Sequence, residues 1–113
     1  MHSHSSAVSR LLVAYRGLLE QRFGDRLISM RLFGSRARGD ARADSDVDIA
    51  IVIRALTEKE RSEAIRLGFE AWLSWGPTAP EISPLVWSDV EHANCVEGER
   101  RIALDIENEG IPI

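Results

Sequence analysis

Two aspartates two positions apart are the residues of this sequence whose type and spacing most directly suggest chemistry. Asp46 and Asp48 stand at the start of a run of apolar residues. In an extended strand, residues i and i+2 share a face with their Cα atoms about 6.6 Å apart, so the two carboxylates can converge. Close carboxylates repel each other, and a Mg²⁺ ion keeps both ionised while bridging them to substrate phosphates. Taken alone, the pair fits the polar face of an open sheet equally well.

A Gly-Ser turn lies upstream of the aspartates. At Gly34 the absent side chain lets backbone amides approach a phosphate, and the Ser35 hydroxyl adds a donor. Glycine and serine also build ordinary turns, so this pair alone is a weak signal. Arg36 and Arg38 follow as candidate nucleotide-binding residues, because guanidinium groups suit triphosphate oxygens, although both also fit a solvated surface.

In combination, these residues closely resemble the Gly-Ser-x10-Asp-x-Asp signature of the minimal nucleotidyltransferases, which belong to the DNA polymerase beta-like superfamily. Ten residues separate Ser35 from Asp46, and the diagnostic segment covers residues 32–53. The resemblance implies nucleotidyl transfer from a nucleoside triphosphate, with two Mg²⁺ ions beside the α-phosphate. It also implies that Asp46 and Asp48 bind metal and that Gly34 and Ser35 hold the β- and γ-phosphates.

The family adds a third carboxylate from a later strand, which helps to bind the catalytic metal and polarises the nucleophile. Glu81 is the candidate here, because it begins the segment that leads into a predicted strand over 82–87 and its longer side chain gives it reach. The expected catalytic and metal-binding set is therefore Asp46, Asp48 and Glu81. Ser83 points to the same side of that strand, and a register that puts Ser83 at the catalytic position leaves only two carboxylates.

The resemblance implies transfer of a nucleoside monophosphate, with AMP from ATP expected, onto a hydroxyl of a protein partner. Short chains of this family resemble antitoxins that are paired with an HEPN-type RNase toxin and adenylylate its tyrosine, so such a toxin is the expected partner. The alternative is a weak or inactive module that keeps the fold and acts by binding its partner. The acceptor, the nucleotide base and any homo-oligomer stay open.

The charge and composition of the chain argue against several classes of function. The net charge of −4 argues against strong nucleic-acid binding, which usually requires a basic surface. No apolar stretch is long enough for a membrane span, and the polar start is unlike a signal peptide, so a cytoplasmic location is expected. The single cysteine, Cys95, cannot form an internal disulfide. Residues 1–113 are expected to form one domain, with residues 1–5 disordered.

Hydrophobic periodicity outlines the elements that must position these residues. Apolar residues at helical spacing predict a helix over 6–23. The alternation of Ile28, Met30 and Leu32 with polar residues predicts a half-buried strand over 27–33, which ends at the Gly-Ser turn. A short turn or helix then carries the arginines.

A period-two pattern over 46–53 predicts the second strand, with its odd-numbered residues on one face and the aspartates on the other. Thr57 and Glu60 form a capping-box signature at the start of a predicted helix over 57–74. The apolar face of that helix is expected to carry Ile65, Phe69 and Trp72.

The remaining residues predict a third strand over 82–87 and two short helices over 88–96 and 99–109. Pro84 has no amide to donate, so the third strand is expected at a sheet edge or a bulge. The order of elements predicts an α/β (α+β) fold of the nucleotidyltransferase type, with a small mixed β-sheet of about three strands and helices packed on it.

Overall fold

The computed structural model describes residues 6–39, 46–75, 80–98 and 101–113. Residues 1–5, expected to be disordered, lie outside the described residues. The elements are α1 (Ser6–Phe23), η1 (Gly24–Arg26), β1 (Leu27–Phe33), α2 (Ser35–Arg38), β2 (Val47–Ile53), α3 (Glu58–Trp75), β3 (Ile82–Ser88), α4 (Asp89–Glu97), α5 (Arg101–Glu109) and β4 (Ile111–Pro112).

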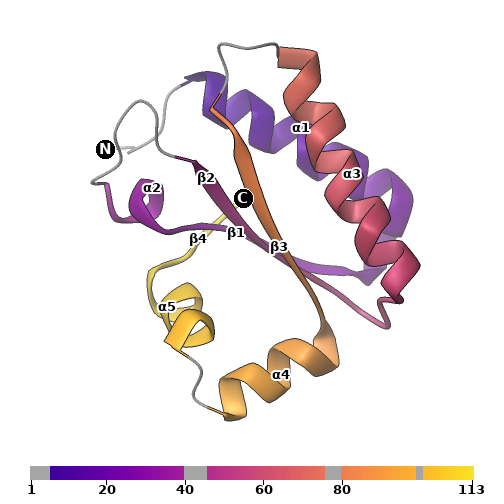
Figure 1. The fold of residues 1–113 in the computed structure, drawn as a ribbon, viewed down its shortest axis with the longest axis vertical. Coiled ribbons are helices and arrows are strands. Elements are labelled where there is room, and N and C mark those ends of the chain that lie inside the picture. Colours follow the sequence, from indigo (N-terminus) through magenta and orange to yellow (C-terminus); the bar gives the residue numbers. More distant parts are fainter. Residues whose placement is uncertain (1–5, 40–45, 76–79, 99–100) are drawn as a thin grey trace.

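The strands form one mixed sheet in the order β3-β2-β1-β4 (Figure 1). β1 pairs antiparallel with β2 and with β4, whereas β2 and β3 run parallel. The expected mixed sheet is confirmed, with four strands rather than about three. β4 is the addition, because its two residues are too few to show a period in the sequence. β3 lies at the edge, as Pro84 predicted.

Helices α1 and α3 pack side by side on one face of the sheet (Figure 1). Val47, Ile49, Ile51 and Ile53 of β2 are fully buried in the core cluster on this face, which confirms the predicted alternation. From α1, Tyr15 joins the cluster, and its hydroxyl donates a hydrogen bond to the carbonyl of Ala64 on α3 at 2.7 Å. Apolar burial of this kind stabilises the fold by about 25 cal/mol per Å².

Helices α4 and α5 lie on the opposite face of the sheet (Figure 1). The even-numbered residues of β2 face this side, and Ala50 and Val52 among them are buried. Ala103 and Ile106 are the buried residues of α5. The central strand is therefore covered on both faces along most of its length, and Asp48 is the one residue of β2 that is not fully buried.

Two predictions about the core were wrong. Ile28 is 53% exposed, because the β1–β2 register shifts between Leu27 and Ser29 and this irregularity turns its side chain outward. Phe69 is also exposed, at 38%, although Ile65 and Trp72 pack partly against the core. Among residues 58–74 of α3, whose burial the structure describes, the buried ones are instead small: Ala64, Gly68 and Ala71.

Close packing of α3 explains the difference. A Cβ on Gly68 would lie 2.7 Å from Ile82 Cδ1 and 2.8 Å from Tyr15 Cζ. Contacts this short leave room for a hydrogen atom but not for a methyl group. The helix therefore presents its small residues to α1 and β3, and larger apolar side chains flank the line of contact.

Capping confirms where α3 begins. The Thr57 amide donates to Glu60 Oε1 at 3.0 Å, and the Glu60 amide donates to Thr57 Oγ1 at 3.2 Å. A second box, between Ser88 and Glu91, begins α4. Each box satisfies two amides at a helix N-terminus that have no partner within the helix. Within the ranges that the structure describes, none of the helices is both long and apolar enough to cross a membrane.

Candidate active site

A sharp turn at Gly34 joins β1 to the short helix α2 (Figure 1). Its backbone angles are φ 74° and ψ −154°, a combination that is open essentially to glycine alone. The carbonyl of Gly34 accepts hydrogen bonds from the amides of Ala37 and Arg38, both at 3.1 Å. The predicted turn is therefore present, and backbone amides of α2 stabilise it by these hydrogen bonds.

The side chain of Asp48 points at this turn. Asp48 pairs across the sheet with Phe33, the residue before Gly34. A Cβ on Gly34 would lie 2.3 Å from Asp48 Oδ2 and 3.2 Å from its Cγ, so the carboxylate occupies the space that any other residue would fill. The structure thus brings the turn and the second aspartate into direct contact.

Asp46 lies one residue before β2 and is exposed, whereas Asp48 is half-buried. Burial raises the pKa of the Asp48 carboxyl above its usual value, and the nearby Asp46 carboxylate raises this pKa further. The guanidinium of Arg38 acts in the opposite direction and lowers it. The charges of Asp46 and Arg38 therefore both act on Asp48, as expected if the three side chains lie near one another at the end of the sheet.

The donor set of this aspartate pair fits one magnesium ion. Mg²⁺ prefers oxygen ligands and commonly uses one or two carboxylates together with substrate phosphates. A cation between Asp46 and Asp48 would offset the repulsion that raises the pKa of Asp48. Because Gly34 has no Cβ, the carboxylate of Asp48 can lie beside the turn. Phosphate oxygens at the turn could then complete the ligand set of the cation.

The other predicted nucleotide contacts differ in exposure. Ser35 is half-buried at the start of α2, and Arg38 is exposed at its end. Arg36 is buried, with 4% of its surface exposed, so the structure does not present it as an open contact for phosphate. The sequence could not separate these two arginines, because both follow the same Gly-Ser pair.

The predicted third carboxylate, Glu81, lies next to Asp46 and not opposite Asp48. Glu81 is exposed and precedes β3, and its carbonyl accepts a hydrogen bond from the Val47 amide at 2.9 Å. The residue opposite Asp48 in the parallel register is Ser83. Among the described residues, no group of three or more acidic, histidine or cysteine side chains is arranged to hold a metal ion. The structure therefore does not gather Glu81 with Asp46 and Asp48.

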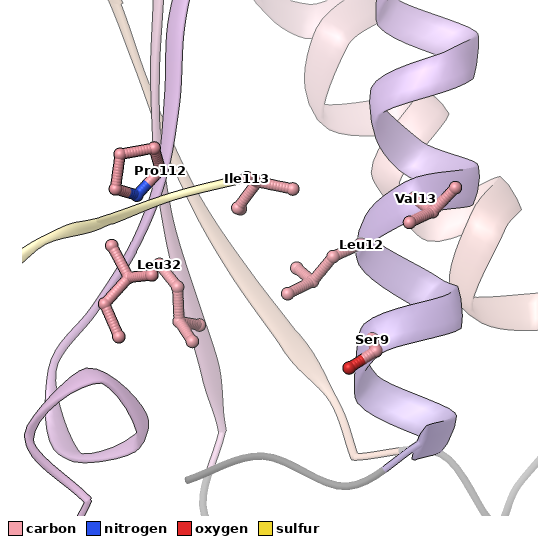
Figure 2. A pocket seen from close by; sticks show the side chains of 7 residues that line it. Ser9, Leu12, Val13, Leu32, Pro112 and Ile113 are labelled. Carbon is pink, nitrogen blue, oxygen red and sulfur yellow. The ribbon is translucent and has the colours of Figure 1, made fainter. Parts of the chain in front are cut away.

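An apolar pocket of about 200 Å³ lies elsewhere, between α1 and the C-terminal strand (Figure 2). Its lining includes Leu12, Leu32, Pro112 and Ile113, and no charged side chain contributes to it among the residues that the structure describes. Triphosphate binding relies on cations and on several hydrogen-bond donors, and the single hydroxyl of Ser9 in this lining does not supply these. The pocket is therefore not the nucleotide site, and the turn at Gly34 remains the candidate.

Known proteins share both the fold and parts of the sequence. The "Putative protein adenylyltransferase MJ1305" of Methanocaldococcus jannaschii is 45% identical over 49 residues, which are 42% of this chain and 33% of that relative. The "Putative protein adenylyltransferase MJ0141" of the same organism is 29% identical over 90 residues, 79% of this chain and 81% of the relative. The chain thus aligns with about a third of the first relative and with most of the second.

A solved structure of a "putative nucleotidyltransferase" from Sulfolobus solfataricus has the same fold. The match has a TM-score of 0.51 and covers 96% of this chain and 86% of that one, at 19% sequence identity. The model of the family described as "Nucleotidyltransferase domain" matches residues 14–102, which include the Gly-Ser turn, both aspartates and Glu81. This match extends over most of the chain, and the chain therefore belongs to the nucleotidyltransferase domain family.

Proposed function

We propose that this nucleotidyltransferase transfers AMP from ATP to a hydroxyl group of a protein. The observation that carries the proposal is the contact between Asp48 and Gly34, because it sets the carboxylate proposed to bind metal beside a turn suited to phosphates. Two relatives whose names include protein adenylyltransferase support the choice of AMP and of a protein acceptor.

Each residue of the site has a proposed role. Asp46 and Asp48 hold Mg²⁺, and Gly34 and Ser35 hold the β- and γ-phosphates. Arg38 is exposed beside the pair, where its positive charge can contact the triphosphate. Bound Mg²⁺ neutralises the triphosphate and makes the α-phosphorus more electrophilic. The protein's own contribution is to orient the α-phosphate, so that the acceptor oxygen and the leaving group lie in line.

The proposed reaction is balanced by ATP and the acceptor alone. The acceptor hydroxyl oxygen forms a new bond to the α-phosphorus, and the bond from this phosphorus to the oxygen bridging to the β-phosphate breaks. Pyrophosphate leaves with that bridging oxygen, and the hydroxyl proton passes to water. The products are an adenylylated protein and pyrophosphate, so no oxidant or second cofactor is needed.

A protein acceptor suits the charge of this chain better than a nucleic acid does. The net charge of −4 opposes binding of a polyanion, which depends on neutralising phosphates with basic residues. We propose a tyrosine of an HEPN-type RNase toxin as the acceptor, which would make this chain the antitoxin of the pair. The reaction consumes ATP, so the proposal places the protein in the cytoplasm.

Transfer of label tests the proposal. The chain is incubated with an HEPN-type RNase, Mg²⁺ and ATP radiolabelled at the α-phosphate, and the label on the RNase is located by mass spectrometry. Asp48→Asn should lower the rate at least about 100-fold, which corresponds to about 2.7 kcal/mol of barrier. Asp25→Asn is the matched control, because this exposed residue precedes β1, at the end opposite the site. Its rate should equal that of the wild type.

The alternative function, a module that acts by binding alone, predicts a different result. The chain would bind the RNase with and without ATP, no label would be incorporated, and Asp48→Asn would bind as tightly as the wild type. Labelling that persists in Asp48→Asn would also overturn the proposed reaction, because it would arise outside the aspartate pair.

A further inference from the structure

Ser83 lies opposite Asp48 in the parallel pair of β2 and β3. In the parallel register of β2 and β3, Val47 lies opposite Ile82 and Asp48 lies opposite Ser83. Val47 and Ile82 are both buried in the core under α1 and α3. Successive side chains of a strand point to opposite faces, so Ser83 and Asp48 face the same side, away from that core.

Glu81 lies two residues before Ser83, on the same face of the sheet. Continued by one residue, the register pairs Asp46 with Glu81 on the same face, just before the first residues of β2 and β3. The backbone supports this placement, because the Val47 amide donates to the Glu81 carbonyl at 2.9 Å. The Glu81 side chain is exposed, and within the described part of the chain it does not join the aspartates in a group of three ligands.

We infer that the site holds a single divalent cation, bound by Asp46 and Asp48, and that Ser83 stands where the carboxylate for a second cation would be needed. The inference rests on the proposed function, because it concerns the same aspartate pair. The two carboxylates carry two negative charges, which balance one divalent ion. A neutral serine hydroxyl adds no charge and is a much weaker ligand for Mg²⁺ than a carboxylate is.

Counting bound Mn²⁺ ions tests the inference without measuring transfer. The full chain is titrated with Mn²⁺ in the presence of a non-hydrolysable ATP analogue, with calorimetry for the number of sites and electron paramagnetic resonance for coupling between ions. Each complex of the wild type with the analogue should hold one ion in all, with the spectrum of an isolated Mn²⁺. Ser83→Asp should bind a second ion and show a coupled pair, as expected for metals about 3.5–4 Å apart.

Two matched variants separate the roles of the neighbouring residues. Ser62→Asp makes the same chemical change at an exposed position of α3, and it should leave the ion count at one. Glu81→Gln should also leave the count at one. A second ion bound by the wild type, or an ion lost in Glu81→Gln, would overturn the inference and leave the proposed transfer reaction standing. No ion bound by the wild type would overturn both.

Thermal unfolding gives a second readout. Without a cation, the new carboxylate of Ser83→Asp lies beside Asp48, and their repulsion should lower Tm. Mn²⁺ should then raise the Tm of Ser83→Asp more than it raises that of the wild type, because ligand binding stabilises the state that binds. An equal rise in both proteins would contradict the placement of Ser83 beside Asp48.

Discussion

The carboxylate of Asp48 lies against the backbone of Gly34, with its Oδ2 only 2.3 Å from the point where a Cβ of residue 34 would be. This contact joins the end of β1 to the first residues of β2. The position of a proposed metal ligand therefore depends on the absence of a side chain one strand away. The Gly-Ser turn and the aspartate pair are one structural unit, although eleven positions of the chain lie between Gly34 and Asp46.

Gly34→Ala should displace Asp48 and weaken cation binding. The new methyl group would overlap the carboxylate, and alanine is strained at φ 74° and ψ −154°. We expect the free energy of unfolding to fall by about 1–3 kcal/mol, the usual cost of such backbone strain. The affinity for Mn²⁺ should fall at least about tenfold, or about 1.4 kcal/mol. Urea unfolding and Mn²⁺ titration measure the two effects separately.

Gly24→Ala is the control for backbone strain. Gly24 also has a positive φ, 57°, but a Cβ there would meet no atom within 4 Å. Its substitution should cost about 1–2 kcal/mol of stability, the penalty for a left-handed residue, and should leave Mn²⁺ affinity unchanged. An equal loss of affinity in both variants would mean that strain, and not the contact with Asp48, weakens binding.

Glu60→Gln should reduce stability at neutral pH but not in strong acid. Glu60 forms hydrogen bonds with Arg26 at 2.7 and 2.9 Å, and this ion pair together with the Thr57 amide lowers the pKa of the carboxyl from 4.5 to about 2. A lowered pKa in the folded state stabilises the fold above pH 4.5, and this contribution is lost as the pH falls towards 2. The Tm difference between wild type and Glu60→Gln should therefore shrink across that range.

Glutamine at position 60 can still accept the capping hydrogen bond from Thr57, so the variant isolates the ion pair. Glu70→Gln is the matched control on the same helix. Its partner is Arg66, and both side chains are at least half exposed, so the pair should contribute little at any pH. A Tm difference for Glu60→Gln that stays constant from pH 7 to pH 2 would show that Arg26 does not control the ionisation of Glu60.

Tyr15→Phe should lower the free energy of unfolding by about 1–2 kcal/mol, as expected when a buried hydrogen bond is lost. The tyrosine is fully buried between the two helices, and its hydroxyl is the donor to Ala64 on α3. Urea unfolding measures the loss, and Mn²⁺ binding should stay unchanged because α1 and α3 lie on the face of the sheet opposite Asp48. Equal stability of the two proteins would mean that this hydrogen bond makes no net contribution.

Burial also raises the pKa of the Tyr15 hydroxyl well above its ordinary value of 10.0. A raised pKa stabilises the fold below pH 10, and this contribution is lost as the pH rises further. The wild type should therefore lose stability above pH 10 faster than Tyr15→Phe does. Because Tyr15 is the only tyrosine of the chain, the absorbance of tyrosinate reports its ionisation directly.

Much of this structure could be read from the order of the residues alone. The bounds of α1 and β1 follow from hydrophobic periodicity, which depends only on neighbours a few positions apart. The start of α3 follows in the same way from Thr57 and Glu60, because a capping box is a contact within one helical turn. The spacing of the Gly-Ser turn and the aspartate pair was also sufficient to predict the nucleotidyltransferase family.

Contacts between distant segments were decided only by the tertiary structure. Ile28 turns outward because of an irregularity in strand pairing, and Gly68 sets the buried face of α3 because Tyr15 and Ile82 pack against it. Strand register decides that Ser83, and not Glu81, lies opposite Asp48. Alternation along a strand assigns residues to a face, but it leaves open which residue of the neighbouring strand is the partner, since a shift of two positions preserves every face. That choice is made by how the whole sheet and its helices pack.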